Sequence, residues 1–148
     1  MSDKEPSKED AASAASAWNA TIIEEFRVNE GKVGGPFEGA PVLLLGTTGA
    51  RTRAHRTNPM MFLQQSGKTY VFASKAGADT NPDWFHNLVA DSDVTVEIGS
   101  EKFEATAKPV VGEERDRIYA IQAERYPGFA EYQEKTTRTI PVVELIRV

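Results

Sequence analysis

The sequence predicts an α+β protein built on an antiparallel β-barrel, or a strongly curved sheet, with helices packed outside it. Six short segments either alternate apolar and polar residues or form a compact apolar run, and most are joined by hairpin turns. Three or four segments with helical spacing precede or separate them. No Gly-rich strand-to-helix turn supports a dinucleotide-binding fold.

The chain begins with a polar segment and a helix. Residues 1–9 are rich in charge and include one Pro, so we expect a disordered tail ahead of a single domain over residues 10–148. An apolar stripe at i+4 spacing predicts an N-terminal helix over residues 10–28. The stripe consists of Ala14, Trp18, Ile22 and Phe26.

Three strands follow. Residues 42–48 form a branched apolar run bounded by Pro and Gly, which predicts a buried strand. Residues 58–65 and 69–74 are two further strand candidates. They are joined by Gln65-Ser66-Gly67-Lys68, which predicts a hairpin turn.

Two helices and three strands complete the chain. Asn81-Pro82-Asp83 has the composition of an N-cap, a first-position Pro and a first-turn acid, so we expect a helix from there to about Ala90. Residues 94–98 and 103–111 alternate apolar and polar side chains around a Gly99-Ser100 turn, which predicts paired strands. The remaining elements are a helix over 112–126, ended by Pro127-Gly128, and a strand over 142–148.

The amino-acid composition is that of a soluble globular protein, and it excludes several classes of functional site. The 148 residues are 40% hydrophobic and 26% charged, with a net charge of −5. The absence of Cys excludes disulfides, zinc–thiolate sites and thiol nucleophiles. The N-terminus has no apolar core of a signal peptide, and the longest apolar run is far too short to span a bilayer. We therefore expect a cytoplasmic protein.

The charge is distributed unevenly along the chain. The stretch from Gly39 to Ala78, called here the basic island, holds five Lys or Arg residues and no Asp or Glu. Subtracting it from the 17 basic and 22 acidic residues of the whole chain leaves 12 basic and 22 acidic residues elsewhere. A basic island on an acidic protein indicates a small polyanionic ligand, because a general polyanion binder is basic overall. The net charge also argues against nucleic acid as a partner.

A basic loop lies at the centre of this island, between the first two predicted strands, and is about eight residues long. Its Thr hydroxyls, Gly and backbone N–H groups can form an anion cradle. Arg51, Arg53 and Arg56 supply permanently charged donors whose geometry suits phosphate. The alternative is a solvated hairpin loop, but a loop that needs only solubility normally mixes the two charge signs.

Three other segments are candidates for a site. Residues 73–78 follow a strand, and their small side chains would let a flat ligand approach the backbone, although an ordinary turn explains them equally well. Core packing explains the aromatics of helix 81–90, whereas Asn87 is a poor helix former. Three aromatics at i, i+3 and i+6 line a pocket or form a core-facing stripe: Tyr126, Phe129 and Tyr132.

The sequence supplies no redox or nucleophilic group of its own. It has no nucleophile elbow, Walker loop or HExxH motif. The two histidines, His55 and His86, lack a third ligand, so we expect no metal site. If the chain is an enzyme, its reactive chemistry belongs to a bound organic cofactor.

A set of short motifs occurs in order from Pro41 to the C-terminus. They are Leu-Leu-Leu-Gly-Thr-Thr-Gly (43–49), Arg51-Thr52, Arg56-Thr57-Asn58-Pro59-Met60-Met61, Ala73-Ser74-Lys75-Ala76-Gly77, Asn81-Pro82-x-Trp84-Phe85-x-Asn87-Leu88 and Ile140-Pro141-Val142-Val143. No motif is specific alone, but the ordered set resembles the deazaflavin-dependent nitroreductase family, reductases that use coenzyme F420.

The resemblance implies an antiparallel split β-barrel, similar to the FMN-binding split barrels, that transfers a hydride from the reduced deazaflavin to a quinone, nitroaromatic or conjugated enone. Ser74 and Tyr132 would donate hydrogen bonds to the acceptor as catalytic residues, and Tyr126, Phe129 and Tyr132 would line its pocket. The cofactor-binding residues would be Arg51, Thr52, Arg56, Thr57, Asn58, Pro59, Met60, Met61, Ala73, Ser74, Lys75, Asp83, Trp84, Phe85, His86 and Asn87.

The chain departs from the family pattern at several places. The usual loop reads Gly-Arg-Lys-Ser-Gly-x-x-Arg, whereas here Ala50 replaces the Arg, Arg51 the Lys and Arg53 the second Gly. Arg53 therefore puts a Cβ where the family often has none. Phe129 stands where the family often has Tyr, which removes a hydroxyl that could orient an acceptor.

Two other classes of function stay open at this stage. The same barrel could bind FMN or another phosphate-bearing cofactor, and the protein could be a non-enzymatic module that carries a lipid or haem. In both alternatives the protein would bind a small molecule. The N-terminal helix could rest on a membrane face as a peripheral contact, although Glu24 and Glu25 disfavour this. The sequence is compatible with a monomer or a homodimer.

Overall fold

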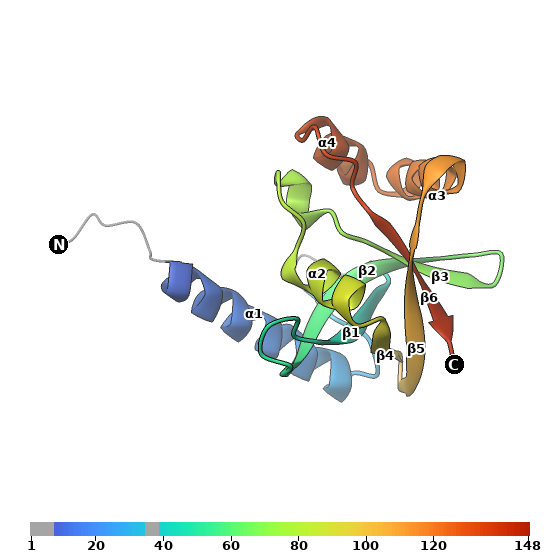
Figure 1. Cartoon of the computed structure of the whole chain (residues 1–148). Helices are drawn as coiled ribbons and strands as arrows, with labels where there is room; N and C mark the ends of the chain where they lie inside the picture. Colours follow the sequence, from blue (N-terminus) through green and yellow to red (C-terminus); the bar gives the residue numbers. More distant parts are fainter. Residues whose placement is uncertain (1–7, 35–38) are drawn as a thin grey trace.

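Six antiparallel strands close into a barrel in the order β1-β2-β3-β6-β5-β4 (Figure 1). The computed structural model describes residues 8–34 and 39–148, with side chains from residue 18 onward in these ranges. The predicted class, an α+β split barrel with peripheral helices, is confirmed. The strands are β1 Val42–Thr48, β2 His55–Gln65, β3 Lys68–Phe72, β4 Asp93–Ile98, β5 Glu101–Val110 and β6 Val142–Arg147.

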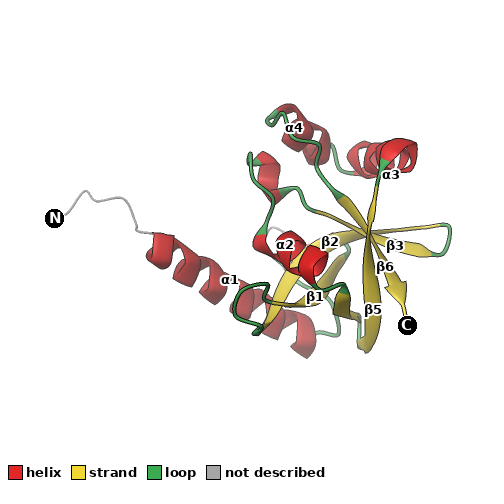
Figure 2. Cartoon of the chain, viewed as in Figure 1, coloured by secondary structure: helices red, strands yellow, loops and turns green. Residues whose placement is uncertain are grey.

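The helices of the described residues lie outside the barrel, as Figure 2 shows. α3 and α4 lie together at one end of the barrel, and α1 runs along the opposite side (Figure 1). Their bounds are α1 Lys8–Val28, the 3-10 helix η2 Lys75–Gly77, α2 Asp83–Ala90, α3 Gly112–Arg125 and α4 Gly128–Glu134.

Alternation along the strands separates the barrel interior from its outer surface. In β1, Leu43 and Leu45 belong to the interior cluster, to which all six strands contribute, whereas Val42 and Leu44 pack against the helical layer outside. Leu88 of α2 also belongs to the interior cluster. α2 therefore covers an opening of the barrel beside β1.

A second cluster joins α3 and α4 to the outer face of the sheet. Ile118 and Tyr119 of α3 and Phe129 of α4 pack with Phe72 of β3 and Val142 of β6. The Phe129 ring lies 5.6 Å from that of Phe72 and 6.4 Å from that of Tyr119, both edge to face. This packing fixes α4 relative to the end of β3, where the predicted Ser74 segment begins.

α1 is anchored by its C-terminal half only. Ile22 and Phe26 of the predicted stripe are buried against β1, but Trp18 is 51% exposed and the helix extends away from the barrel beyond it (Figure 1). The side chain of Ala14, the fourth member of the predicted stripe, lies outside the described residues. The helix begins at Lys8, and residues 1–7 of the expected tail are not among the described residues. None of the described helices is long and apolar enough to cross a membrane.

Two predictions about local structure are wrong. β2 begins at His55 rather than residue 58, because Arg56 and Thr57 pair with Thr47 and Gly46 of β1 and extend the ladder. The loop is therefore only Gly49–Ala54. The predicted Asn81 cap is also wrong: α2 begins at Asp83, Pro82 occupies the N-cap, and no side chain caps the helix.

Candidate functional site

The basic loop between β1 and β2 is a compact turn held by its own backbone. The Gly49 N–H donates to the Ala54 carbonyl at 2.7 Å, and the Arg53 N–H donates to the Gly49 carbonyl at 2.9 Å. The Thr52 hydroxyl accepts the Ala54 N–H at 3.2 Å. Arg53 adopts φ +62°, so the position that replaces a usual Gly has a left-handed backbone. Arg51 and Thr52 are both exposed at the tip.

Asn87 of α2 ties this loop to the barrel. Its Oδ1 accepts the Ala50 N–H at 3.0 Å, and its Nδ2 donates to the Thr47 hydroxyl at 3.2 Å. Thr47 is 1% exposed, so this bond also satisfies a buried polar group. A helix-disfavouring Asn in α2 thus has a structural reason, which is to position the loop.

Only part of the positive charge is neutralised within the chain. Arg53 pairs with Asp91 at 3.4 Å across an exposed surface. Within the described residues, Arg51 and Arg56 form no ion pair. Their guanidinium groups therefore remain available to an anion at the surface of the loop and at the start of β2.

The second half of the basic island, at the end of β3, has a folded-back backbone. Ser74 lies in the right-handed helical region, whereas Lys75 and Ala76 have φ +46° and +52°. A right-handed residue followed by a left-handed one turns successive N–H groups toward one side, which can hold an anion. In the described part of the chain, the N–H groups of Ser74, Lys75 and Ala76 have no acceptor. The Lys75 ammonium donates to the Thr80 hydroxyl at 3.0 Å.

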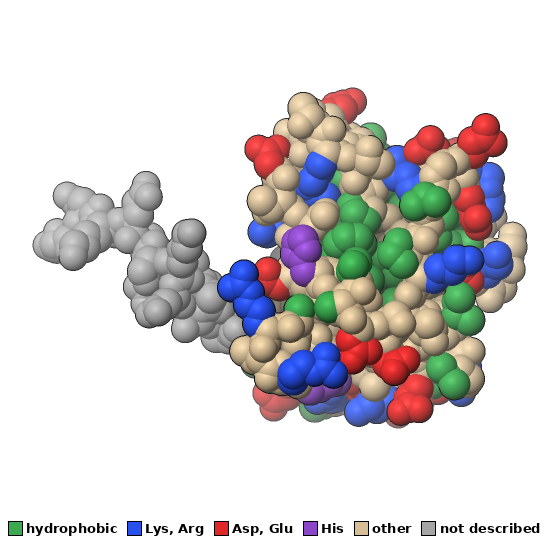
Figure 3. All heavy atoms as spheres, in the orientation of Figure 1, with side chains coloured by type: hydrophobic (Ala, Val, Ile, Leu, Met, Phe, Trp, Pro, Cys, Tyr) green, Lys and Arg blue, Asp and Glu red, His purple; other side chains and the backbone are tan. Residues whose placement is uncertain are grey.

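α2 connects these two halves of the island. Its N-terminus follows Ala78 and Asn81, next to η2, and its last turn carries Asn87 against the basic loop (Figure 1). An eight-residue helix is about 12 Å long. Figure 3 shows hydrophobic side chains at the centre of this face, with Lys and Arg side chains on several sides of them. An elongated anionic ligand with an apolar part fits this arrangement.

The predicted residues of β2 do not all face one direction. Asn58 and Met60 are in register with Leu45 and Leu43 of β1, and the Met60 side chain belongs to the barrel interior. Met61 points to the opposite face and is half-buried between the two outer clusters. Because side chains alternate along a strand, Met61 and its i−2 neighbour Pro59 share the outer face.

The predicted residues of α2 divide in the same way. Trp84 and Phe85 are half-buried and pack against the barrel interior, as the core-packing interpretation of these aromatics predicts. Asp83 and His86 are exposed on the outer side of the helix, and the His86 ring meets the edge of Phe85 at 6.2 Å. A bound molecule could therefore contact Asp83 and His86 more easily than Trp84 and Phe85.

The three aromatics after α3 also differ in their surroundings. Phe129 is 7% exposed and lies in the core, and its carbonyl accepts the Tyr119 hydroxyl. Burial raises the pKa of Tyr119 to about 12. Tyr126 and Tyr132 are half-buried around it, with the Tyr132 ring 5.4 Å from that of Phe129. Phe129 thus forms part of the buried surface against which Tyr126 and Tyr132 pack.

A glycine brings Tyr132 close to the Ser74 segment. Gly77 of η2 has φ +82°, and a Cβ at this position would lie 2.9 Å from the Tyr132 carbonyl oxygen. No larger residue allows α4 to approach η2 so closely. The two predicted catalytic residues, Ser74 and Tyr132, are therefore on adjoining segments.

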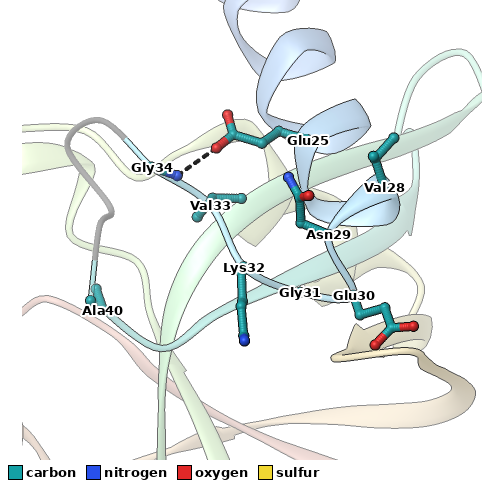
Figure 4. A pocket seen from close by; sticks show the side chains of 10 residues that line it. Glu25, Val28, Asn29, Glu30, Gly31, Lys32, Val33, Gly34 and Ala40 are labelled. Atoms are coloured by element: carbon teal, nitrogen blue, oxygen red, sulfur yellow. Dashed lines mark hydrogen bonds between the residues drawn. The ribbon is translucent and has the colours of Figure 1, made fainter.

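Two cavities in the described part of the chain lie away from the predicted site residues. The larger, about 910 Å³, is an open hollow between the end of α1 and the turn that follows it, where Glu25 accepts the Gly34 N–H at 2.6 Å (Figure 4). It contains none of the predicted site residues. The smaller, about 320 Å³, lies between β1, β4 and β5 and is lined in part by Thr47 and His55. Charge and backbone geometry, rather than cavity size, therefore mark the candidate site.

Sequence reasoning missed one residue that contacts this region directly. Arg138, in the loop between α4 and β6, donates hydrogen bonds to the backbone around Ser74 and to Asn81. Burial lowers the pKa of its guanidinium. A lone Arg in a polar loop gives no sequence signal, because its partners are about sixty residues away along the chain.

Comparison with known proteins identifies the family. The model of the F420H(2)-dependent quinone reductase family matches residues 18–146. The F420H(2)-dependent quinone reductase Rv1261c of Mycobacterium tuberculosis is 39% identical over 126 residues, which cover 82% of this chain and 85% of that protein. An F420-H2 dependent reductase, FDR-A, of solved structure is 39% identical with a TM-score of 0.65, covering 71% of this chain and 93% of its own.

A further solved structure, a domain-swapped dimer, is 34% identical with a TM-score of 0.67 and covers 88% of this chain and 98% of its own. The family match spans most of the chain, including the basic loop, α2 and the Ser74 segment. It agrees with the resemblance that the ordered sequence motifs indicate. The chain belongs to the F420H(2)-dependent quinone reductase family.

Proposed function

We propose that this protein binds the reduced deazaflavin coenzyme F420 across α2 and uses it to reduce a quinone. The observation that carries the proposal is the pair of anion-binding elements at the two ends of α2. Within the described residues, one end has Arg51 and Arg56, which form no ion pair, and the other has the N–H groups of Ser74, Lys75 and Ala76, which have no acceptor. The family supplies the identity of the coenzyme.

The residues present fit such a coenzyme. Its phosphate and acidic tail require cations and N–H donors, and both halves of the basic island offer them, with no Asp or Glu within residues 39–78. Its flat ring requires an apolar surface, for which the candidates are Pro59 and Met61 on the outer face of β2 and the half-buried Ser74 at the end of β3, whereas Ala73 is fully buried and offers only its backbone. Within the described residues, the side chains of α2 add Trp84 and Phe85 behind this surface.

The bound coenzyme supplies the hydride, so the protein needs no thiol, metal or second redox group of its own. The protein would have to orient the acceptor at about 3–3.5 Å from the reacting carbon and shield it from water. A quinone oxygen gains negative charge during the reaction, and the hydroxyl of Ser74 or Tyr132 would donate a hydrogen bond to it. The adjoining positions of η2 and α4 support this pair of donors.

Quinones are the acceptor class that we propose first, and nitroaromatics and conjugated enones come second. A quinone needs hydrogen bonds to its oxygens, which Ser74 and Tyr132 can give. Reduction of a nitro group benefits from additional proton donors, and Phe129 is buried in the core and supplies none. Small-molecule acceptors, a cytoplasmic location, a peripheral membrane contact of α1 and a monomer or homodimer stay predictions.

The test is the oxidation of the reduced coenzyme, followed by its absorbance, with a soluble benzoquinone, a nitroaromatic or a cyclohexenone as acceptor. We expect turnover with the quinone that exceeds the rate without enzyme, and slower turnover with the nitroaromatic. The Ser74→Ala, Tyr132→Phe double variant should retain coenzyme binding and lose quinone turnover. Absence of turnover with every quinone tried would refute the proposed acceptor class while leaving coenzyme binding to be measured separately.

A further inference from the structure

Arg138 makes a set of hydrogen bonds that converge on one short segment. Its Nε donates to the Ala78 carbonyl at 2.7 Å, one terminal nitrogen donates to the Ser74 carbonyl at 2.8 Å, and the other donates to the Ala73 carbonyl at 3.2 Å. The last nitrogen also donates to the Asn81 side-chain oxygen at 2.8 Å. One planar guanidinium thus holds both ends of residues 73–78 and Asn81, two residues before α2.

The segment that Arg138 holds has an unfavourable backbone. Lys75 and Ala76 are non-Gly residues with positive φ, a conformation that costs free energy and persists only where the surroundings enforce it. The Ser74 carbonyl also accepts the Gly77 N–H at 2.9 Å, and the Lys75 carbonyl accepts the Ala78 N–H at 3.0 Å. Arg138 binds the carbonyls of Ala73, Ser74 and Ala78 at the two ends of this turn, so it closes the turn without occupying the N–H groups.

We propose that Arg138 is a positioning residue for coenzyme binding, acting by holding the Ser74–Gly77 turn in the conformation whose N–H groups and Lys75 face the ligand. This inference rests on the proposed function, because it assigns the coenzyme to that turn. Arg138 is half-buried and uses its donors on the backbone, so its role is distinct from that of Arg51 and Arg56, whose charge is free at the surface.

Arg115 of α3 provides a matched comparison within the same region. It also binds a backbone carbonyl, donating to the Ile140 oxygen through Nε at 3.0 Å and through a terminal nitrogen at 2.9 Å. It further donates to Gln133 of α4 at 2.7 Å and lies over the Tyr119 ring at 4.5 Å. Arg115 therefore holds the other side of the α4–β6 loop and makes no bond to residues 73–81 in the described structure. Both arginines should contribute to stability, but only Arg138 should control the coenzyme site.

The experiment compares Arg138→Lys with Arg115→Lys in the full chain. A Lys keeps the charge but cannot hold several carbonyls in fork geometry. We expect Arg138→Lys to raise the dissociation constant of the reduced coenzyme about tenfold, the effect of losing one strong hydrogen bond. Arg115→Lys should change it less than about threefold. Adding millimolar guanidinium to Arg138→Ala should restore part of the affinity, because the free ion can occupy the same carbonyls.

Hydrogen exchange without ligand gives a second readout that does not depend on the coenzyme. In Arg138→Lys, the amides of Gly77 and Ala78, which are hydrogen-bonded within the turn, should exchange faster, whereas in Arg115→Lys they should exchange as in the wild type. Equal changes in affinity for the two variants, or unchanged exchange at the turn in Arg138→Lys, would overturn the positioning role. If the wild type itself does not bind the coenzyme, the proposed function fails, and the exchange data still decide whether Arg138 holds the turn.

Discussion

Gln122 of α3 is the polar side chain whose environment is least satisfied. It is fully buried, and within the described residues neither its Oε1 nor its Nε2 has a hydrogen-bond partner. An unpaired buried amide costs about 1–3 kcal/mol. Its neighbours on the same helix face, Ile118 and Tyr119, belong to the apolar cluster under α3 and α4.

Replacing this amide should therefore stabilise the protein. Gln122→Met keeps the length of the side chain and removes both unpaired groups, so we expect the free energy of unfolding to rise by about 1 kcal/mol in urea titrations. Gln133→Met is the control, because the Gln133 amide is fully engaged with Arg115, Ile140 and the Arg138 carbonyl. That variant should lose stability, and a loss in both variants would mean that Gln122 has a partner in solution.

Tyr119 gives a second prediction at the same scale. Burial raises its pKa in the folded protein to about 12, above the value of 10 for a free tyrosine. The raised pKa stabilises the fold fully below pH 10, and this contribution is lost as the pH rises from 10 toward 12. We expect the stability advantage of the wild type over Tyr119→Phe to shrink across this range in urea titrations. A constant difference from pH 8 to 12 would show that the phenol is not shielded from water.

At the scale of elements, α2 organises the candidate site. One end of this helix lies beside η2 and Arg138, and its last turn covers the barrel interior through Leu88 and holds the basic loop through Asn87. The side chains that hold the two halves of the basic island, Asn87 and Arg138, are distant from them in sequence. The helix therefore sets the distance between the cationic groups that we assign to the two ends of the coenzyme.

Removing the Asn87 amide should loosen the basic loop. In Asn87→Ala, the Ala50 N–H and the buried Thr47 hydroxyl both lose their partner, so we expect faster hydrogen exchange at Ala50 and about tenfold weaker coenzyme binding. Val89→Ala is the control, since Val89 is 60% exposed on the same helix and contacts neither partner. Equal affinities for the two variants would show that loop order does not matter for binding.

Sequence patterns predicted the elements with local signals and failed where tertiary contacts decide. The hairpin at Ser66-Gly67 forms because both residues adopt positive φ, which this pair favours. Asn81 has the composition of a cap, but Arg138 draws its side-chain oxygen away from the helix. The loop residues Arg56 and Thr57 became strand because the β1 ladder extends over them.

At the scale of the whole molecule, the sequence predicted the region of the candidate site but not its geometry. The acid-free stretch and the ordered motifs placed the basic loop and the Ser74 turn in one region, and the barrel brings both to the two ends of α2. The sequence could not show which side of β2 each residue faces or that Phe129 is in the core, because both depend on the register of the closed sheet. The sequence also gave no sign of the hydrogen bonds of Arg138, because their acceptors are mostly backbone oxygens.

We propose that the basic island binds the coenzyme through specific cations rather than through its net charge. Arg51 and Lys68 allow this to be tested, since both belong to the island and both are exposed, but Lys68 lies at the far hairpin turn. Neither forms an ion pair within the described residues.

The measurement is a fluorescence titration of the reduced deazaflavin with wild-type protein, Arg51→Ala and Lys68→Ala at one ionic strength. We predict micromolar binding by the wild type, about tenfold weaker binding by Arg51→Ala and little change in Lys68→Ala. No binding by the wild type at micromolar concentrations, or equal small losses in the two variants, would contradict the claim and leave the island as a solvated surface.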